Sequence, residues 1–204
     1  DVAIVGEPTQ MQMAVAERGL LVLDCKATGA AGHVANNVGV NAIYKAMPDI
    51  DWFRTYRFEK ESTWLGAVNM NITLINAGKA HNQVPDECTF VVDVRLNECY
   101  THAEVLDVIR KHVSCEVKER STRIQPSFIE EVHPLVLAGK SIGLTAFGSS
   151  TTSDMALMPW KAVKMGPGDT KRSHSADEFI YIHEIETGIA TYIQLLNAYA
   201  KQLA

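Results

Sequence analysis

The sequence has no apolar run near the ~20 residues that span a bilayer, no CxxC pair among its four cysteines, and no basic stripe. These absences exclude a membrane-spanning helix and argue against a thiolate zinc site. Nucleic acid is a poor partner, because the net charge is −5 with acids and bases interspersed. No secretory signal is visible, so we expect reduced, buried thiols in a cytoplasmic protein rather than disulfides in a secreted one.

Two further features are missing from the sequence. The chain opens without methionine in an apolar strand-like segment, DVAIVGEPT, so we expect a fragment of a longer protein. No GxSxG elbow surrounds its serines, which leaves serine hydrolysis with little support. What is present is typical of a folded protein, since 47% of the 204 residues are apolar and 21% are charged.

The middle of the chain, residues 15–122, predicts a β-α-β-β-α-β order. Apolar residues alternate with polar ones in two segments, which indicates a sheet covered on one face only. This order is typical of a ferredoxin-like domain. The predicted elements are a strand at 19–28, a helix at 41–47 ended by Pro48, strands at 68–74 and 90–96, a helix opened by a capping box at Thr101, and a strand at 115–118.

The flanking parts, residues 1–14 and 123–204, alternate strands with helices, and this alternation predicts a parallel sheet. We therefore expect an α/β protein in which the ferredoxin-like domain is inserted between two parts of one α/β domain. The predicted elements are a buried strand at 1–6, a helix at 134–142, strands at 144–147 and 162–165, and a helix at 182–202 with Ile185, Ile189, Ile193 and Leu196 on its buried side.

Several side chains are of the types that carry chemistry. Glu7 follows the first strand and His174 precedes the last helix, and both are common zinc ligands, but two ligands do not make a site. The alternative is an exposed strand end and a loop histidine. His33, in a glycine-rich loop, would donate to an oxyanion or simply lie in solvent. Asn82 and Arg95 would clamp a carboxylate or belong to a solvated sheet face.

Five segments together resemble a known family. In this order and spacing they are similar to the zinc aminoacylase and carboxypeptidase family, and most similar to its acetylornithine deacetylase branch. The likeness covers the whole chain, and each motif is weak alone. The segments are IVGEPT (4–9), KATGAAGH (26–33) with NAI at 41–43, NAGKAHNQVPD (76–86) leading to VDVR (92–95), TSD (152–154), and GPG (166–168) continuing through SHSADE (173–178).

The resemblance implies a site with two zinc ions, with cobalt as an alternative metal, and a lid domain that forms a homodimer. Glu7 then corresponds to a ligand of one zinc ion and His174 to a ligand of the other. His33 corresponds to the lid histidine that reaches the partner subunit's site and stabilises the tetrahedral oxyanion.

The resemblance also implies a substrate, an N-acyl amino acid, which Asn82 and Arg95 would hold by its carboxylate. We add Gly148, Ser150 and Asp154 to the substrate-binding residues. N-acetylornithine or a close relative, used in arginine biosynthesis, is the expected substrate. The alternatives are a desuccinylase, a dipeptidase, a general aminoacylase, or a non-catalytic dimerisation module.

The sequence also departs from the family's pattern. The family's H-x-D motif, its bridging Asp and its Glu-Glu pair precede the GEPT segment, and none of them is found here. Glu130-Glu131 lies in the wrong place and is expected to be a solvated pair. The loop at His33 reads GHVANN, without the family's commoner proline. We therefore expect a chain with two of the family's five metal ligands and no general base, inactive by itself.

Overall fold

The structure is a computed structural model that describes residues 1–203, and it divides into two compact units. Unit 1 comprises residues 1–19, 63–65 and the chain from 126 onward, and unit 2 comprises residues 20–62 and 66–125. The sequence predicted domain boundaries after residues 14 and 122, a few residues from those observed. It did not predict that residues 63–65 belong to unit 1. Each unit has its own buried apolar cluster.

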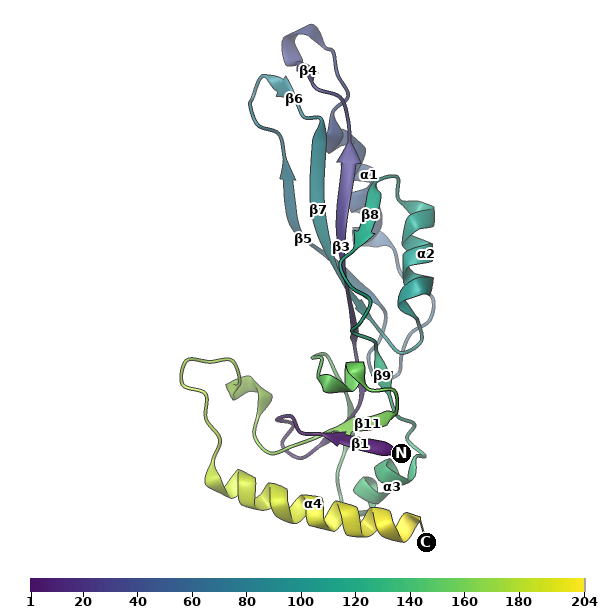
Figure 1. Cartoon of the computed structure of the whole chain (residues 1–204), viewed down its shortest axis with the longest axis vertical. Helices are drawn as coiled ribbons and strands as arrows, with labels where there is room; N and C mark the ends of the chain where they lie inside the picture. The colour runs from purple at the N-terminus through teal and green to yellow at the C-terminus, as the bar shows by residue number, and fades with distance from the viewer. Residues whose placement is uncertain (204) are drawn as a thin grey trace. The chain divides into compact units, whose positions relative to one another are not determined.

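Unit 2 has the predicted β-α-β-β-α-β order. Its elements are β3 (Gly19–Thr28), α1 (Ala42–Thr55), β5 (Asn69–Ala77), β7 (Glu87–Leu96), α2 (His102–His112) and β8 (Glu116–Glu119). The sheet order is β5-β7-β3-β8. Both helices contribute to one apolar cluster with the sheet, so they cover the same face of it (Figure 1). Burial alternates along β7, which confirms the sheet covered on one face.

Helix α1 does not end at Pro48, so that prediction was wrong. The Asn41 side chain caps its first turn through Ile43 N (2.9 Å), and the helix continues to Thr55. Proline removes one helical hydrogen bond, but Phe53, only 1% exposed, anchors the turn beyond it in the core. The buried Asp49 carboxylate also accepts hydrogen bonds from the backbone at residues 114 and 115. Tertiary packing therefore outweighs the local break.

Helix α2 begins with the predicted capping box. Thr101 Oγ1 accepts from Glu104 N (3.2 Å), and Glu104 Oε2 accepts from Thr101 N (2.8 Å). The Glu104 carboxylate accepts from the amide of Thr101 and also from its hydroxyl (2.9 Å), and these two bonds favour the ionised form and lower the pKa of Glu104. The helix start is therefore fixed by local sequence.

The four cysteines all lie in unit 2 and are free thiols. Burial raises the pKa of the Cys88 and Cys99 thiols. The pKa of Cys115 is raised first by its hydrogen bond with Cys25 and then by burial. Protonated thiols are poor nucleophiles, which agrees with the expectation of reduced, structural cysteines.

The small-residue loop of unit 2 contains a two-stranded ladder that the sequence did not indicate. Strand β4 (Gly32–His33) pairs with β6 (Gln83–Val84) in antiparallel fashion. A Cβ at Gly29 would lie 2.0 Å from Val40 O, and one at Gly32 would lie 2.0 Å from Val38 O. Only glycine fits such a close backbone approach, so the glycines here shape the loop. A short 3-10 turn, η1 (Val34–Asn36), follows β4.

The sheet of unit 1 is mixed rather than purely parallel. Its order is β1-β11-β2-β10, with β9 also paired to β2. Strand β1 is parallel to β11, and β10 to β2, whereas β2 is antiparallel to β11 and β9. Strand β1 is only partly buried because it has one neighbour at its edge position. The strands are β1 (Val2–Val5), β2 (Met13–Glu17), β9 (Ser127–Phe128), β10 (Ala146–Ser149) and β11 (Lys161–Lys164), of which β2 and β9 were not foreseen.

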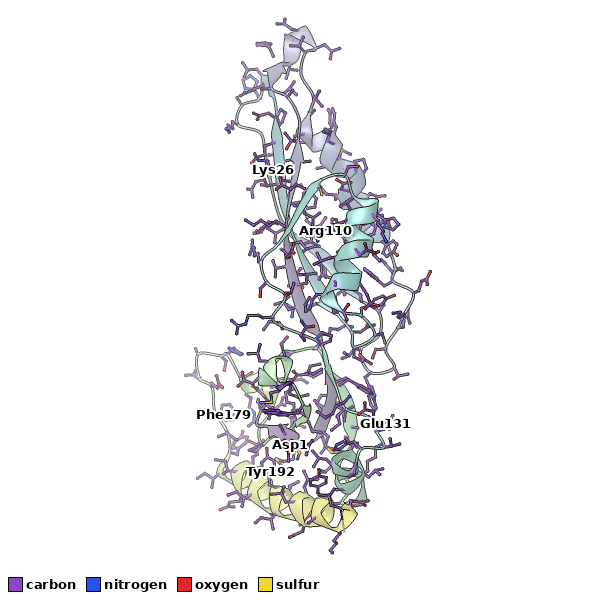
Figure 2. All side chains as sticks on the ribbon, turned by 45° about the vertical axis from the view of Figure 1, so that its right-hand side comes forward. Asp1, Lys26, Arg110, Glu131, Phe179 and Tyr192 are labelled. Carbon is purple, nitrogen blue, oxygen red and sulfur yellow. The ribbon has the colours of Figure 1, made fainter. Side chains whose placement is uncertain are left out.

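Two helices complete unit 1, α3 (Pro134–Ser141) and α4 (Ile182–Gln202), close to the predicted ranges. The predicted buried face of α4 was wrong. Its four assigned positions, at 185, 189, 193 and 196, are 41–58% exposed. Gly188 and Leu195 are buried instead, and the hydroxyl of Tyr192 donates to Met165 O (Figure 2). Gly188 permits this approach, since a Cβ there would already contact Pro167.

Within residues 1–203, no helix combines the length and the apolar character that crossing a bilayer requires.

Candidate active site

Glu7 lies just beyond the carboxyl end of β1, where it lines a pocket of about 170 Å³. Strand β11 is parallel to β1 and ends at the same edge of the sheet. This is the edge at which α/β proteins bind ligands. The Glu7 side chain is exposed. The pocket is lined by Glu7, Pro8, Thr9, Gln10, Phe147, Ser149, Thr151, Lys164, Asp169 and Thr170.

The GEPT segment is hydrogen-bonded to the GPGD segment 157 residues later in the chain. The amides of Thr9 and Met11 both donate to Gly166 O (3.1 and 2.9 Å), and Gly166 N donates to Thr9 Oγ1 (3.1 Å). Gln10 Nε2 donates to Asp169 Oδ2 (2.8 Å). A Cβ at Gly166 would lie 2.7 Å from Glu7 O. These contacts bring Glu7 beside the segment that leads, through η3 (Thr170–Arg172), to His174.

His174 has a left-handed backbone with φ of 58°. Such a conformation is uncommon for a residue other than glycine and is often found at functional positions. His174 N donates to Glu178 Oε2 (3.0 Å). This bond uses the backbone amide and not the imidazole, which is exposed.

Arg172 braces the segment around His174. Its guanidinium stacks on the rings of Phe179 (5.0 Å) and Tyr181 (5.1 Å) and forms an ion pair with Glu184 on α4 (Figure 2 shows Phe179). The hydrogen bond to Arg172 lowers the pKa of Glu184, and the same bond raises the pKa of Arg172. The loop before α4 is therefore tied to the helix.

The two candidate ligands fit a metal ion as part of a ligand set. A carboxylate and an imidazole suit zinc, which takes about four ligands. Within residues 1–203, however, no cluster of three or more His, Cys, Asp and Glu side chains could hold a metal ion. Asp169 lines the pocket, but both its oxygens accept bonds, from Gln10 Nε2 and Lys171 N. The metal roles of Glu7 and His174 stay predictions.

Strand β10 and the segment after it contain the other candidate substrate-binding residues. Ser150 and Asp154 are exposed, and their substrate-binding role stays a prediction. Gly148 has a packing role, since a Cβ there would lie 2.2 Å from Trp64 O. Ser153 caps the 3-10 turn η2 (Asp154–Leu157), because its side chain accepts from Met155 N.

His33 and Asn82 come together in unit 2. His33 pairs with Gln83 in the β4–β6 ladder, and Val34 N donates to Asn82 O (3.2 Å). His33 Nδ1 accepts from Ala35 N (3.2 Å), so the proton of the neutral ring is assigned to Nε2. The exposed Nε2–H is then a donor of the kind an oxyanion needs.

The carboxylate clamp of Asn82 with Arg95 stays a prediction, and within one chain it would have to span a long stretch of strand. Arg95 lies near the far end of β7, eight residues beyond Glu87, or about 26 Å of extended strand. Its guanidinium donates to both oxygens of Asp93 (2.6 and 3.0 Å). The alternation of β7 showed that Arg95 faces away from the core, but it did not show the length of strand between the two residues.

A buried charge pair in unit 1 was missed by the sequence interpretation. Lys164 Nζ on β11 lies 2.6 Å from Glu17 Oε1 on β2, and the two side chains are 4% and 0% exposed. Neither residue stood out in the sequence, because β2 was not predicted and β11 also carries the exposed Lys161. By contrast, Glu130 and Glu131 are exposed and pair with surface lysines, as expected of a solvated pair.

Comparison with known proteins identifies the family. A model of the M20 peptidase dimerisation domain matches residues 15–121, more than half of the chain. The chain belongs to the M20 peptidase family. The match falls mainly on unit 2, so unit 2 is a dimerisation domain of the M20 type.

The relatives of this M20 chain are longer than it is. It is 24% identical over 226 residues to an acetylornithine deacetylase of Yersinia pseudotuberculosis, covering 99% of this chain and 57% of that protein. It is 26% identical over 196 residues to a Pyrobaculum aerophilum protein named for hydrolysis of LysW-lysine and LysW-ornithine, covering 91% and 55%. A dinuclear metal binding peptidase of the M20 family from Bacillus subtilis shares the fold, with a TM-score of 0.65 at 14% identity over 98% of this chain and 56% of that one. The chain thus spans little more than half the length of these relatives.

Proposed function

We propose that the protein of which this chain is part hydrolyses the amide bond of an N-acyl amino acid, with zinc bound at Glu7 and His174. The observation that supports this most is the set of hydrogen bonds between residues 9–11 and 166–169. These bonds hold Glu7 beside the segment that leads to His174. A module for dimerisation alone would need neither residue nor the pocket at Glu7.

The carboxylate of Glu7 and the imidazole of His174 would hold the zinc ion through oxygen and nitrogen. When bound, the metal would supply Lewis acidity for the attack of water on the acyl carbonyl. His33 donates its Nε2–H to the oxyanion that forms on the acyl carbonyl. Because this chain has only two of the ligands, we propose that it is inactive by itself.

N-acetylornithine or a close relative is the proposed substrate, since an acetylornithine deacetylase is among the relatives. A second relative is named for LysW-linked lysine and ornithine, so a basic amino acid is common to both names. Desuccinylase, dipeptidase and aminoacylase activities are the alternatives within the family. We further propose a cytoplasmic homodimer that forms through unit 2, in keeping with the dimerisation domain there.

The test uses the full-length protein and a panel of N-acetyl, N-succinyl and N-formyl amino acids together with dipeptides. We expect fastest hydrolysis of N-acetylornithine, loss of activity after chelation, and recovery with zinc. Glu7→Gln should lose activity, whereas Glu59→Gln, an exposed carboxylate of unit 2, should not. Absence of hydrolysis across the panel would refute the function. Hydrolysis by the 204-residue chain alone would refute the incomplete site.

A further inference from the structure

The buried pair of Glu17 and Lys164 has no role in the function proposed above. Burying two opposite charges costs desolvation free energy, and a well-packed apolar pair in their place is often neutral or stabilising. The pair is therefore weak evidence for stability. Its hydrogen-bond partners indicate a different role.

Lys164 has no donor left for a ligand. An ammonium group carries three N–H donors. Lys164 Nζ contacts Glu17 Oε1 (2.6 Å), Ser149 Oγ (2.8 Å) and Thr151 Oγ1 (3.0 Å), with Thr151 O at 3.3 Å. These contacts use all three donors. Lys164 lines the Glu7 pocket, yet it is committed to protein groups.

Glu17 holds the same segment from the other side. Its Oε2 accepts from both the amide and the hydroxyl of Ser153 (3.0 and 2.9 Å). Among residues 1–203, the side-chain partners of the two charged residues, apart from each other, are groups at 149, 151 and 153. Charge-assisted hydrogen bonds are about twice as strong as neutral ones, so the segment 149–153 is fixed at three alternate positions.

The fixed segment lies at the candidate site. Ser149 and Thr151 line the pocket together with Glu7. Ser150 lies between these two held residues, and Asp154 follows the held Ser153. Both are exposed candidates for substrate binding.

We propose that the Glu17–Lys164 pair is a positioning device that holds residues 149–153 so that Ser150 and Asp154 meet the substrate. This inference rests on the proposed function. Neither charged residue touches the substrate. Their removal should therefore raise KM more than it lowers kcat.

The experiment compares Lys164→Met with Lys161→Met in the full-length protein. Lys161 lies on the same strand, but its ammonium is exposed and pairs with Glu130 (2.6 Å). In Lys164→Met we expect amide hydrogen exchange at 149–153 to accelerate about tenfold or more, which corresponds to loss of one charged hydrogen bond. KM should rise by a similar factor, whereas Lys161→Met should change neither quantity.

A double variant, Glu17→Leu with Lys164→Met, covers the case in which an unpaired buried charge prevents folding. It leaves no uncompensated charge, so we expect it to fold, to exchange rapidly at Ser153, and to show the raised KM. Unchanged exchange at 149–153 in the folded variants would overturn the positioning role. Faster exchange with an unchanged KM would overturn its link to the substrate. Failure of the proposed function shows separately, as an inactive wild type.

Discussion

Replacing Gly166 with alanine should weaken zinc binding by the full-length protein without unfolding it. An added Cβ would lie 2.7 Å from Glu7 O and 3.1 Å from Glu7 N, whereas ordinary contact begins at 3.4 Å. The Glu7 backbone must therefore move by about 0.7 Å to admit the methyl group. Because Glu7 is a proposed zinc ligand, this movement should displace its carboxylate from the metal site.

The size of the effect follows from the tolerance of metal sites. Metal–ligand distances vary by only about 0.2 Å, so a shift of about 0.7 Å exceeds that range. Disturbing the groups that orient a ligand costs roughly 10- to 100-fold in metal affinity, and we expect the zinc Kd to rise by that factor. Overpacking costs about 1–3 kcal/mol of unfolding free energy, which leaves the protein folded.

Competition with a chromophoric chelator measures the zinc affinity, and urea unfolding measures stability on the same preparations. Gly6→Ala is the matched control, because Gly6 adjoins Glu7 but a Cβ there meets nothing within 4 Å. If Gly166→Ala binds zinc as tightly as the wild type does, the Glu7 backbone does not set the position of a metal ligand. The assignment of Glu7 would then be wrong.

Three further predictions concern other parts of the chain. His33→Ala should lower kcat by roughly 10²–10³, the usual cost of losing one oxyanion donor. Mixing it with Glu7→Gln subunits should restore part of the turnover; no recovery in mixed dimers would contradict a role across subunits. Because Arg172 lowers the pKa of Glu184, this pair stabilises the fold above the unfolded pKa of about 4.5 and loses that contribution as pH falls through the lower folded pKa. Urea titrations from pH 7 to 3 should show that acid lowers the free energy of unfolding less in Glu184→Gln than in the wild type. An equal decrease in both proteins would contradict a stabilising role of the Arg172–Glu184 pair. Phe53→Ala should lower the free energy of unfolding by about 3–5 kcal/mol, measured by urea unfolding. A decrease below ~1 kcal/mol would show that Phe53 does not anchor α1 in the core.

The fold could be predicted where local pattern and tertiary packing agree. The alternation of β7 and the capping box at Thr101 are local signals, and the structure contains both. The predicted end of α1 at Pro48 was wrong, because the burial of Phe53 in the core outweighs the one hydrogen bond that proline removes. On α4 two apolar stripes compete, and the one beside Gly188 is buried because glycine permits closer approach. Periodicity alone cannot rank two such stripes.

The candidate site could be predicted in its residue types but not in its connections. The GEPT and GPGD segments were singled out, yet the hydrogen bonds between Thr9 and Gly166 depend on strand pairing that no local pattern gives. Arg95 was matched to a motif position without knowledge of where β7 begins and ends. The partner of Lys164 was hidden because Glu17 lies in β2, a strand that the sequence did not indicate.

The β4–β6 ladder makes His33 and Asn82 mechanically dependent on each other. A shift in register on either side would carry the imidazole and the amide together, since Val34 N and Asn82 O share a hydrogen bond. An insertion into either connecting loop would thus disturb both groups at once. Directed evolution of a new acyl preference should accordingly yield coupled changes at 30–40 and 76–86 rather than independent ones.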